Sequence, residues 1–450
     1  MTTSRRTFLG ITLAAGAGVG LAACGGTSGP KSSGTAAGGA GAATGGASYW
    51  FLTGTPGQGI RTNTVKRFNA ANPKTQITAT TFQNDAYKTK IKTAIGAGQA
   101  PTIIWGWGGG GLKSYVDASQ VEDLTDWFAQ NSAIKAKIFP AAFGAATVGG
   151  KIYAMPCEAV GPIVLYWNKK VFDQVGVEPP KSWADILDLV PKFNAKGIAP
   201  FSLGGQSRWT NMMWLEFLFD RIGGPGVFQA VFDGKKDAWS DPSSILALTE
   251  MQKLISANGF IKGFSSITAD SNADQALLYT GKAAMMLHGG WTYGSMKADG
   301  GDFVSGGHLG YMNFPRVEGG KGDPSDTVGN PGQYISISSK ATAAEKEIAK
   351  KFLSTTLLDP TEVTQWIQNG SVPVVNGTQD KLAAVPDKLD ADWLTFIYDT
   401  SSQAKNFAQS WDQALSPTAA ESLLDNISKL FQLSITPQQF ADNMNKVIGT

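Results

Sequence analysis

Residues 49–105 read YWFLTGTPGQGIRTNTVKRFNAANPKTQITATTFQNDAYKTKIKTAIGAGQAPTIIW, and this stretch decides the expected fold. Three short apolar or alternating runs predict strands, and two longer runs between them, with apolar residues three or four apart, predict amphipathic helices. In chain order these elements are 49–52, 60–71, 76–82, 85–97 and 101–105. Alternation of strand and helix is typical of a parallel sheet covered by helices, so we expect an α/β fold.

In such a sheet, ligands lie beyond the carboxyl ends of the strands. The segments that follow the three predicted strands are 53–57, 83–85 and 105–111. The glycine run at 108–111 would let backbone amides approach a ligand closely. It lacks the Gly-Lys-Ser/Thr ending and the helix start of a phosphate loop.

The rest of the chain continues as mixed α/β, without an internal repeat. Ser182 to Asp185 resembles a capping box at the start of a helix, and Thr436 with Pro437 and Gln439 opens the last helix. Further elements are predicted as a strand at 334–338 and helices at 341–357 and 362–369.

The N-terminus has the order of a bacterial export signal. Arg5 and Arg6 precede an apolar run that ends in Leu21-Ala22-Ala23-Cys24, which resembles a lipobox. The run is short for a helix that must cross about 30 Å of hydrocarbon. Residues 1–23 are therefore predicted to be a twin-arginine signal peptide and Cys24 to carry lipid, the alternative being an ordinary cleaved signal with a chance cysteine. Residues 24–48, poor in bulky side chains, are predicted to be a flexible tether.

The charge balance argues against polyanionic partners. The formal net charge is +2, and both excess charges fall on Arg5 and Arg6, so the chain from Cys24 has 36 basic and 36 acidic residues. A neutral body has no broad positive field to attract nucleic acid. Contact with the membrane is therefore expected only through the lipid anchor.

The cysteines and histidines predict no metal site and no cofactor. If Cys24 carries lipid, Cys157 has no partner for a disulfide. His288 and His308 lack the spacing of metal ligands. No Ser-His-Asp arrangement or paired-carboxylate motif is evident, so no catalytic residue is predicted.

Four stretches resemble one known family. They are AGQAPTIIW at 97–105, GKIYAMP at 150–156 with LYWNK at 165–169, GKAAMM at 281–286 before Gly290-Trp291, and 334–358 with GSVPV at 370–374. In this order they resemble the extracellular solute-binding proteins of ABC sugar importers, the maltose-binding-like group, over nearly all of 49–450. Thr102 and Trp167 depart from the usual Asp and Tyr of the family.

The resemblance implies a type II periplasmic-binding-protein-like fold, with two α/β lobes, a ligand cleft between them and a hinge that the chain crosses several times. It also implies a monomer on the outer face of the cytoplasmic membrane that delivers a small carbohydrate to ABC permease subunits. With crossings expected near Glu158, Asn330 and Asn376, the N-terminal lobe would comprise 49–158 and 330–376, and the C-terminal lobe 159–329 and 377–450.

A sugar site needs flat rings against C–H faces and polar side chains for hydroxyls. The chain has thirteen tryptophans. The resemblance places Trp291 and Trp411 at positions that commonly stack on sugar, and Arg208 with Trp209 among contacts from the second lobe. The remaining candidates are Trp105 and Trp107 after the third strand, Asp412, Glu158 (alternatively a hinge ion pair), and Asn84 and Asp85 (alternatively helix caps). The other tryptophans, including Trp366, are predicted to pack in the core or on the surface.

Two alternatives remain open. A secreted carbohydrate-active enzyme would need two facing carboxylates, whereas Glu158 and Asp412 stand alone in the sequence. The same fold could instead bind an amino acid, a polyamine or a metal, which would require a cluster of charge in the cleft. The interpretation that we carry forward is capture of a neutral sugar, with a di- or oligosaccharide favoured.

Overall fold

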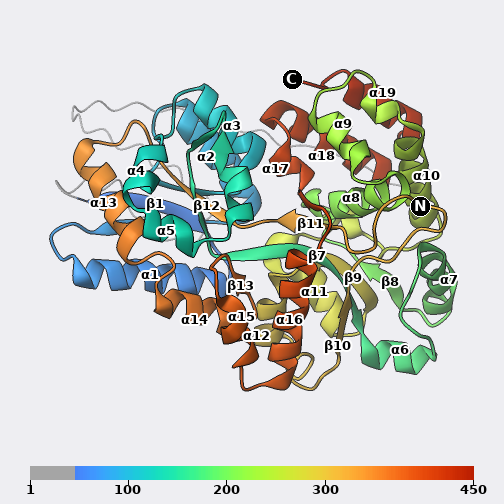
Figure 1. Cartoon of the computed structure of the whole chain (residues 1–450). Helices are drawn as coiled ribbons and strands as arrows, with labels where there is room; N and C mark the ends of the chain where they lie inside the picture. Colours follow the sequence, from blue (N-terminus) through green and yellow to red (C-terminus); the bar gives the residue numbers. More distant parts are fainter. Residues whose placement is uncertain (1–45) are drawn as a thin grey trace, which may run out of the picture. The chain divides into compact units, whose positions relative to one another are not determined.

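The computed structural model describes residues 46–450, and the predictions for the signal peptide and for Cys24 lie outside these residues. The first of its two main sheets has five strands in the order β2-β1-β3-β12-β6 (Figure 1). These strands are β1 (Ala47–Leu52), β2 (Ile77–Phe82), β3 (Ile103–Gly106), β6 (Met155–Cys157) and β12 (Gln333–Ile337). The helices that accompany this sheet are α1 (Gly57–Ala71), α2 (Asn84–Gly96), α3 (Gly109–Asp117), α4 (Thr125–Gln130), α5 (Ser132–Lys137), α13 (Ala343–Thr355) and α14 (Pro360–Gln368).

The second sheet has seven strands, with β14-β11-β7-β9-β8 in order and with β10 and β13 also paired to β7. These are β7 (Ala159–Asn168), β8 (Ala199–Ser202), β9 (Ala283–Gly289), β10 (Leu309–Met312), β11 (Thr327–Asn330), β13 (Val372–Pro373) and β14 (Phe407–Gln409). Its helices are α6 (Lys169–Val175), α7 (Trp183–Asn194), α8 (Trp209–Gly223), α9 (Gly226–Phe232), α10 (Pro242–Ser256), α11 (Ala273–Tyr279), α12 (Thr292–Asp299), α15 (Thr378–Ala383), α16 (Lys388–Ser402), α17 (Trp411–Ala414), α18 (Pro417–Phe431) and α19 (Pro437–Asn445). We call the two sheets with their helices the first and second lobes.

The parallel start of the first sheet is confirmed. β1 pairs in parallel with both β2 and β3, and α1 and α2 connect these strands. α1 begins three residues before the predicted start at Ile60, and α2 one residue before Asp85. The N-cap predicted at Thr436 is present as a full capping box.

The tether was predicted to extend to residue 48, and this boundary is wrong. Ala47 is buried and pairs with Ile77, and its N–H donates to the carbonyl of Gln76. A strand is held through its backbone, so Ala47 and Ser48 join β1 although their side chains are small. Absence of bulky side chains is therefore not enough to exclude pairing at a sheet.

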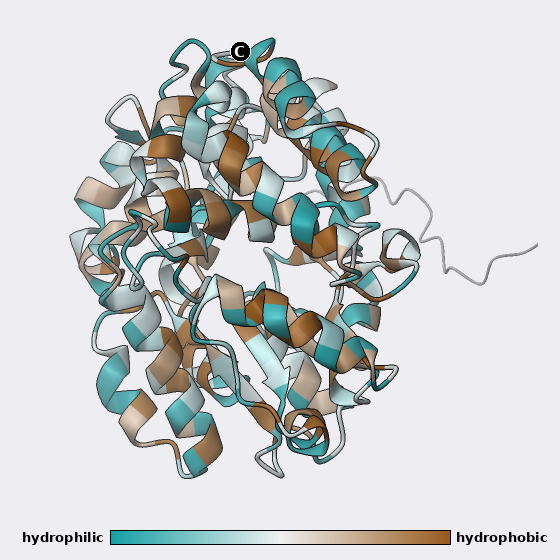
Figure 2. Ribbon diagram, turned by 90° about the vertical axis from the view of Figure 1, so that its right-hand side faces the viewer, coloured by the Kyte–Doolittle hydropathy of each residue, from teal (hydrophilic) through white to brown (hydrophobic). Residues whose placement is uncertain are grey.

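Alternate side chains of β7 belong to two different hydrophobic cores. Ile163 and Leu165 belong to the core beneath α8, α10 and α18, whereas Val164 and Tyr166 belong to the other core, which continues from the first lobe. Successive side chains of a strand point to opposite faces, so a strand buried on both faces has a continuous apolar sequence. The helices that cover the sheets carry alternating hydrophobic and hydrophilic stretches along their ribbons (Figure 2). Within residues 46–450, no helix has both the length and the apolar character needed to cross a membrane.

The chain passes between the sheets close to the predicted crossings. It leaves β6 at Cys157 and enters β7 at Ala159, and it leaves β11 at Asn330 and enters β12 at Gln333. β13 then pairs with β7, which brings the segment after α14 back to the second sheet. The assignment of whole ranges to two domains stays a prediction.

Candidate ligand-binding site

A cavity of about 240 Å³ lies between the two lobes. From the first lobe it is lined by 53–57 after β1, by Gln83 and Asn84 after β2, and by Trp105 and Trp107 at the end of β3. The sequence predicted a ligand at these strand ends, and the structure brings the three segments to one cavity.

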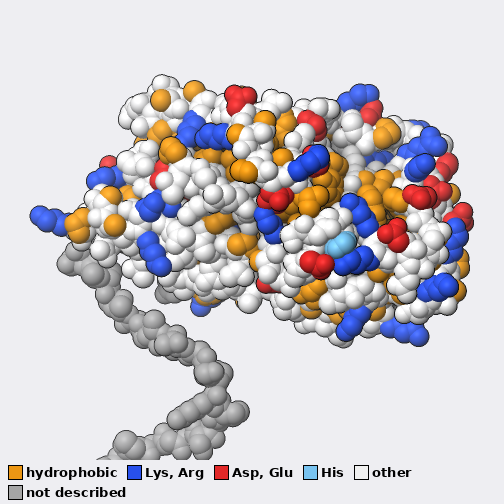
Figure 3. All heavy atoms as spheres, turned by 90° about the horizontal axis from the view of Figure 1, so that it is seen from below, with side chains coloured by type: hydrophobic (Ala, Val, Ile, Leu, Met, Phe, Trp, Pro, Cys, Tyr) orange, Lys and Arg blue, Asp and Glu red, His pale blue; other side chains and the backbone are white. Residues whose placement is uncertain are grey.

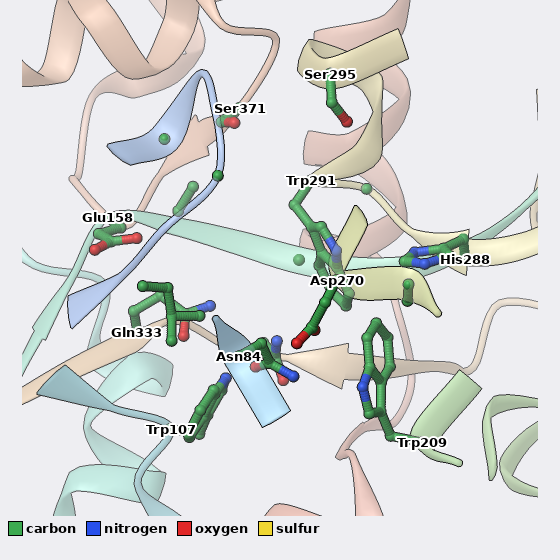
Figure 4. A pocket seen from close by; sticks show the side chains of 18 of the residues that line it. Asn84, Trp107, Glu158, Trp209, Asp270, His288, Trp291, Ser295, Gln333 and Ser371 are labelled. Carbon is green, nitrogen blue, oxygen red and sulfur yellow. The ribbon is translucent and has the colours of Figure 1, made fainter. Parts of the chain in front are cut away.

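Five tryptophans line this cavity, and Figure 4 labels three of them around the hollow, Trp107, Trp209 and Trp291. Trp107 lies on the side of the first lobe, with Trp209 and Trp291 across the hollow. The Trp209 and Trp291 ring centroids are 6.3 Å apart, and Trp291 is 37% exposed, an unusual exposure for so large an apolar side chain. Gly289 leaves room for this ring, because a Cβ atom there would lie 2.1 Å from it.

Glu158 is held in a buried cluster at the crossing between the lobes. Arg61 donates to both of its carboxylate oxygens at 2.7 Å, and Trp105 Nε1 donates to Oε1 at 2.7 Å. The hinge ion pair, which was the alternative for Glu158, is therefore formed, and Glu158 also lines the cavity. Trp105 lines the cavity too, but it is almost wholly buried in the first-lobe core.

Three polar contacts join the lobes across the cavity. Lys88 of α2 forms an ion pair of 2.8 Å with Asp412 of α17. Asp85 accepts from Trp209 Nε1 at 3.2 Å, and its backbone N–H donates to Asp270 at 3.1 Å. Asp85 itself is not among the residues that line the cavity, although it bonds to Trp209, which does line it.

The Lys88→Met variant is expected to bind ligand about two- to fivefold more weakly, because the ion pair to Asp412 stabilises only the arrangement in which both lobes meet. Titration calorimetry with a ligand found by the thermal-shift screen described below measures this loss. Lys92→Met, an exposed change on the same helix, is the control and should leave the affinity unchanged. Equal affinity for Lys88→Met and the parent protein would contradict this role.

Several buried polar atoms of the lining have no hydrogen-bond partner within residues 46–450. Five of them are oxygens: Thr53 Oγ1, Asp270 Oδ1, Asn330 Oδ1, Gln333 Oε1 and Gln413 Oε1. Burial raises the pKa of Asp270. A buried acceptor without a donor costs free energy, so these oxygens favour a ligand that is rich in hydrogen-bond donors.

Besides Asp85, two predicted ligand contacts, Trp411 and Arg208, do not line this cavity. The Trp411 ring is 1% exposed and stacks on Phe228 at 4.5 Å in the second-lobe core, because α17 turns the indole inward while Asp412 faces the cavity. Arg208 lies away from the cavity and forms ion pairs with Glu421 and Asp425 of α18.

The glycine run also has a different role from the one expected. Gly109 begins α3, contrary to the prediction that no helix starts there. A Cβ atom on Gly109 would lie 2.5 Å from the carbonyl oxygen of Gln413, and one on Gly110 would lie 2.1 Å from that of Leu415. These glycines therefore let α3 approach the backbone of the second lobe closely.

The charges of the site are mostly compensated. Arg61 is paired with Glu158 and Lys88 with Asp412, whereas Asp270 forms no ion pair among residues 46–450. On the face shown in Figure 3, positive and negative side chains are interspersed. No group of three or more His, Cys, Asp or Glu in the described part of the chain could hold a metal ion.

Comparison with known proteins adds the family. Residues 52–361 match the model of the bacterial extracellular solute-binding proteins. The chain belongs to this family. A curated relative, a probable sugar-binding periplasmic protein of Mesorhizobium japonicum, is 27% identical over 66% of this chain and 67% of its own length. An uncharacterized ABC transporter extracellular-binding protein of Pyrococcus horikoshii is 24% identical, and the chain spans about half the length of that relative.

Solved structures share the fold of this chain. A protein solved in work on xylan utilization by the thermophilic bacterium Caldanaerobius polysaccharolyticus is 30% identical, with a TM-score of 0.80 over 90% of this chain and 100% of that chain. A chitin oligosaccharide binding protein is 22% identical, with a TM-score of 0.77 over 89% and 98% of the two chains. The expected type II fold is confirmed.

In this extracellular solute-binding protein, sequence reasoning missed several residues that line the cavity. They include Arg61, Lys88, Asp270, His288, Gln333 and Trp366. Trp366 was predicted to pack elsewhere. Glu158 and Arg61 are 97 positions apart, and Lys88 and Asp412 are 324 apart, so local spacing carries no signal of either pair.

Proposed function

We propose that this protein captures a small neutral sugar between its lobes and delivers it to the permease of an ABC importer. The observation that carries the proposal is the set of unpartnered oxygens beside three indole rings. Sugar hydroxyls donate hydrogen bonds, and the C–H faces of a pyranose stack on aromatic rings. The names of similar proteins, sugar-binding and chitin-oligosaccharide-binding among them, support the same class of ligand.

The pairing of charges in the lining supports a neutral ligand. Both cations of the lining, Arg61 and Lys88, are already engaged by carboxylates, so neither offers a free charge to a phosphate or a sugar acid. Asp270 is the carboxylate without a cation, and a cationic solute is therefore the alternative ligand. The five unpartnered oxygens of the lining favour the sugar, because its several hydroxyls can donate to them.

We further propose that the protein is not an enzyme and acts outside the cytoplasmic membrane as a lipid-anchored monomer. Both oxygens of Glu158 accept hydrogen bonds from the protein, and Asp412 is paired with Lys88, so neither is placed as a free acid or base. The lipobox at 21–24 supports the anchor. Incorporation of radiolabelled lipid into the protein, and its loss in the Cys24→Ala variant, tests the proposed lipid anchor.

A thermal-shift screen tests the ligand class. The purified protein is heated with mono-, di- and trisaccharides, with amino acids and with polyamines. A sugar at about 100 times its Kd should stabilise the folded state by about 2.7 kcal/mol and quench or shift indole fluorescence. Stabilisation by a polyamine or an amino acid, with no response to any sugar, would overturn the proposal.

A further inference from the structure

A second cavity, of about 1040 Å³, also has walls from both lobes. The first lobe contributes the start of α3 and residues 144–149, and the second lobe contributes parts of α8, α9, β11 and β14. None of the residues that line it lines the first cavity. It is therefore a separate space.

The segment 409–415, which we call the ledge, separates the two cavities. Ser410, Asp412 and Gln413 face the first cavity, whereas Gln409, Trp411, Ala414 and Leu415 face the second. Gln409 Nε2 donates to the carbonyl of Trp107 at 2.8 Å, and α17 lies against both α3 and α18 (Figure 1). The ledge is thus held against the first lobe and forms a wall common to both spaces.

Buried polar groups with unused hydrogen-bonding capacity line the second cavity. Glu216, 3% exposed, accepts from the Trp411 backbone N–H at 2.7 Å through Oε1, while Oε2 has no partner in the described chain. Thr327 is also 3% exposed, and its hydroxyl is likewise unpartnered within 46–450. Burial raises the pKa of Glu216 to about 8, so its carboxyl is protonated at neutral pH and can donate.

The remaining walls include aromatic rings and paired charges. Phe407 is half-buried and Phe232 is 54% exposed, so both rings retain free surface at the cavity. Arg221 donates to Asp220 and to the carbonyls of Phe314, Pro324 and Asp326, and Lys113 pairs with Asp117. The cavity therefore offers hydroxyl and carboxyl groups beside aromatic rings, without a free cation among its described residues.

We propose that this second cavity is a separate binding site for a neutral sugar, held by the Glu216 carboxyl and the Thr327 hydroxyl against Phe232 and Phe407. Buried groups that lack partners are costly unless something bonds to them, and a polyhydroxylated ligand both donates to and accepts from such groups. The site goes beyond the proposed function, because its residues are distinct from those of the first cavity.

Equilibrium dialysis of the full chain against millimolar maltotriose, xylotriose or diacetylchitobiose counts the sugars bound. With at least one of these sugars, two molecules should bind to each protein chain at saturation. Thr327→Val and Glu216→Met remove the hydrogen-bonding group while nearly keeping the side-chain size, and each should weaken binding of the second sugar about tenfold while leaving the first unchanged. The matched control is Ser244→Ala, which removes a buried unpartnered hydroxyl outside both cavities. It should change the binding of neither the first nor the second sugar.

A maximum of one sugar per chain with all three probes would overturn the second site. Binding of the second sugar that Thr327→Val and Glu216→Met both leave unchanged would also overturn it. The Trp291→Ala variant distinguishes the two proposals. If it loses only the sugar bound in the first cavity, the second site stands on its own. If the parent protein binds no sugar in the first cavity, the proposed function is contradicted instead.

Discussion

The Trp411→Ala variant is expected to lose about 3–5 kcal/mol of unfolding free energy, because it empties a fully buried site. The indole stacks on Phe228 and packs against Phe219 at 4.9 Å and Trp239 at 5.8 Å between ring centroids. Urea unfolding followed by circular dichroism measures the loss. The part of the variant that remains folded should still bind sugar in the first cavity, since the ring does not line it.

Trp411→Phe is the companion variant, and it should recover much of the lost stability, because a smaller ring can still pack on Phe228. An Ala variant as stable as the parent protein, but without sugar affinity, would show that the ring lies in the cleft when ligand is bound. That outcome would restore the role predicted from sequence.

Trp291→Ala is expected to show the opposite pattern, a loss of sugar affinity of about 2 kcal/mol, or roughly thirtyfold, with little change in stability. The ring is exposed on the cavity side and packs mainly against Trp209 and His288. Truncation therefore removes the stacking surface without opening a hole in either core. Titration calorimetry with the best sugar of the thermal screen gives the affinity.

The matched control for loss of an indole is Trp127→Ala. Trp127 is a half-buried residue of α4 that lines neither described cavity. The Trp127→Ala variant should leave the affinity unchanged. Equal affinities for Trp291→Ala and Trp127→Ala would mean that the sugar does not stack on Trp291.

Trp291 and Trp411 show that the direction of a side chain could not be predicted from the sequence. Both follow small residues and both matched family positions, yet the Trp291 ring is exposed in the first cavity and the Trp411 ring is almost wholly buried among second-lobe core residues. The direction of a side chain at a short helix depends on what packs behind it, here Phe228 and Trp239, and these contacts are made between distant segments. Periodicity cannot report such contacts.

The elements of the first sheet, in contrast, were predictable. Alternation and helical spacing in 49–105 are local properties, and they gave three parallel strands whose carboxyl ends meet at one cavity. The boundary at Ala47 and the helix at Gly109 were not predictable in this way, because backbone pairing and close approach to 413–415 decide them.

A crystal structure of the protein grown with its best-stabilising sugar tests the central claim most directly. We expect sugar density in the first cavity, with a pyranose face on the Trp291 or Trp209 ring and hydroxyls bonded to Asn330, Gln333 and Asp270. A saturated crystal with no sugar between these rings, or with those oxygens still unpartnered, would contradict the account.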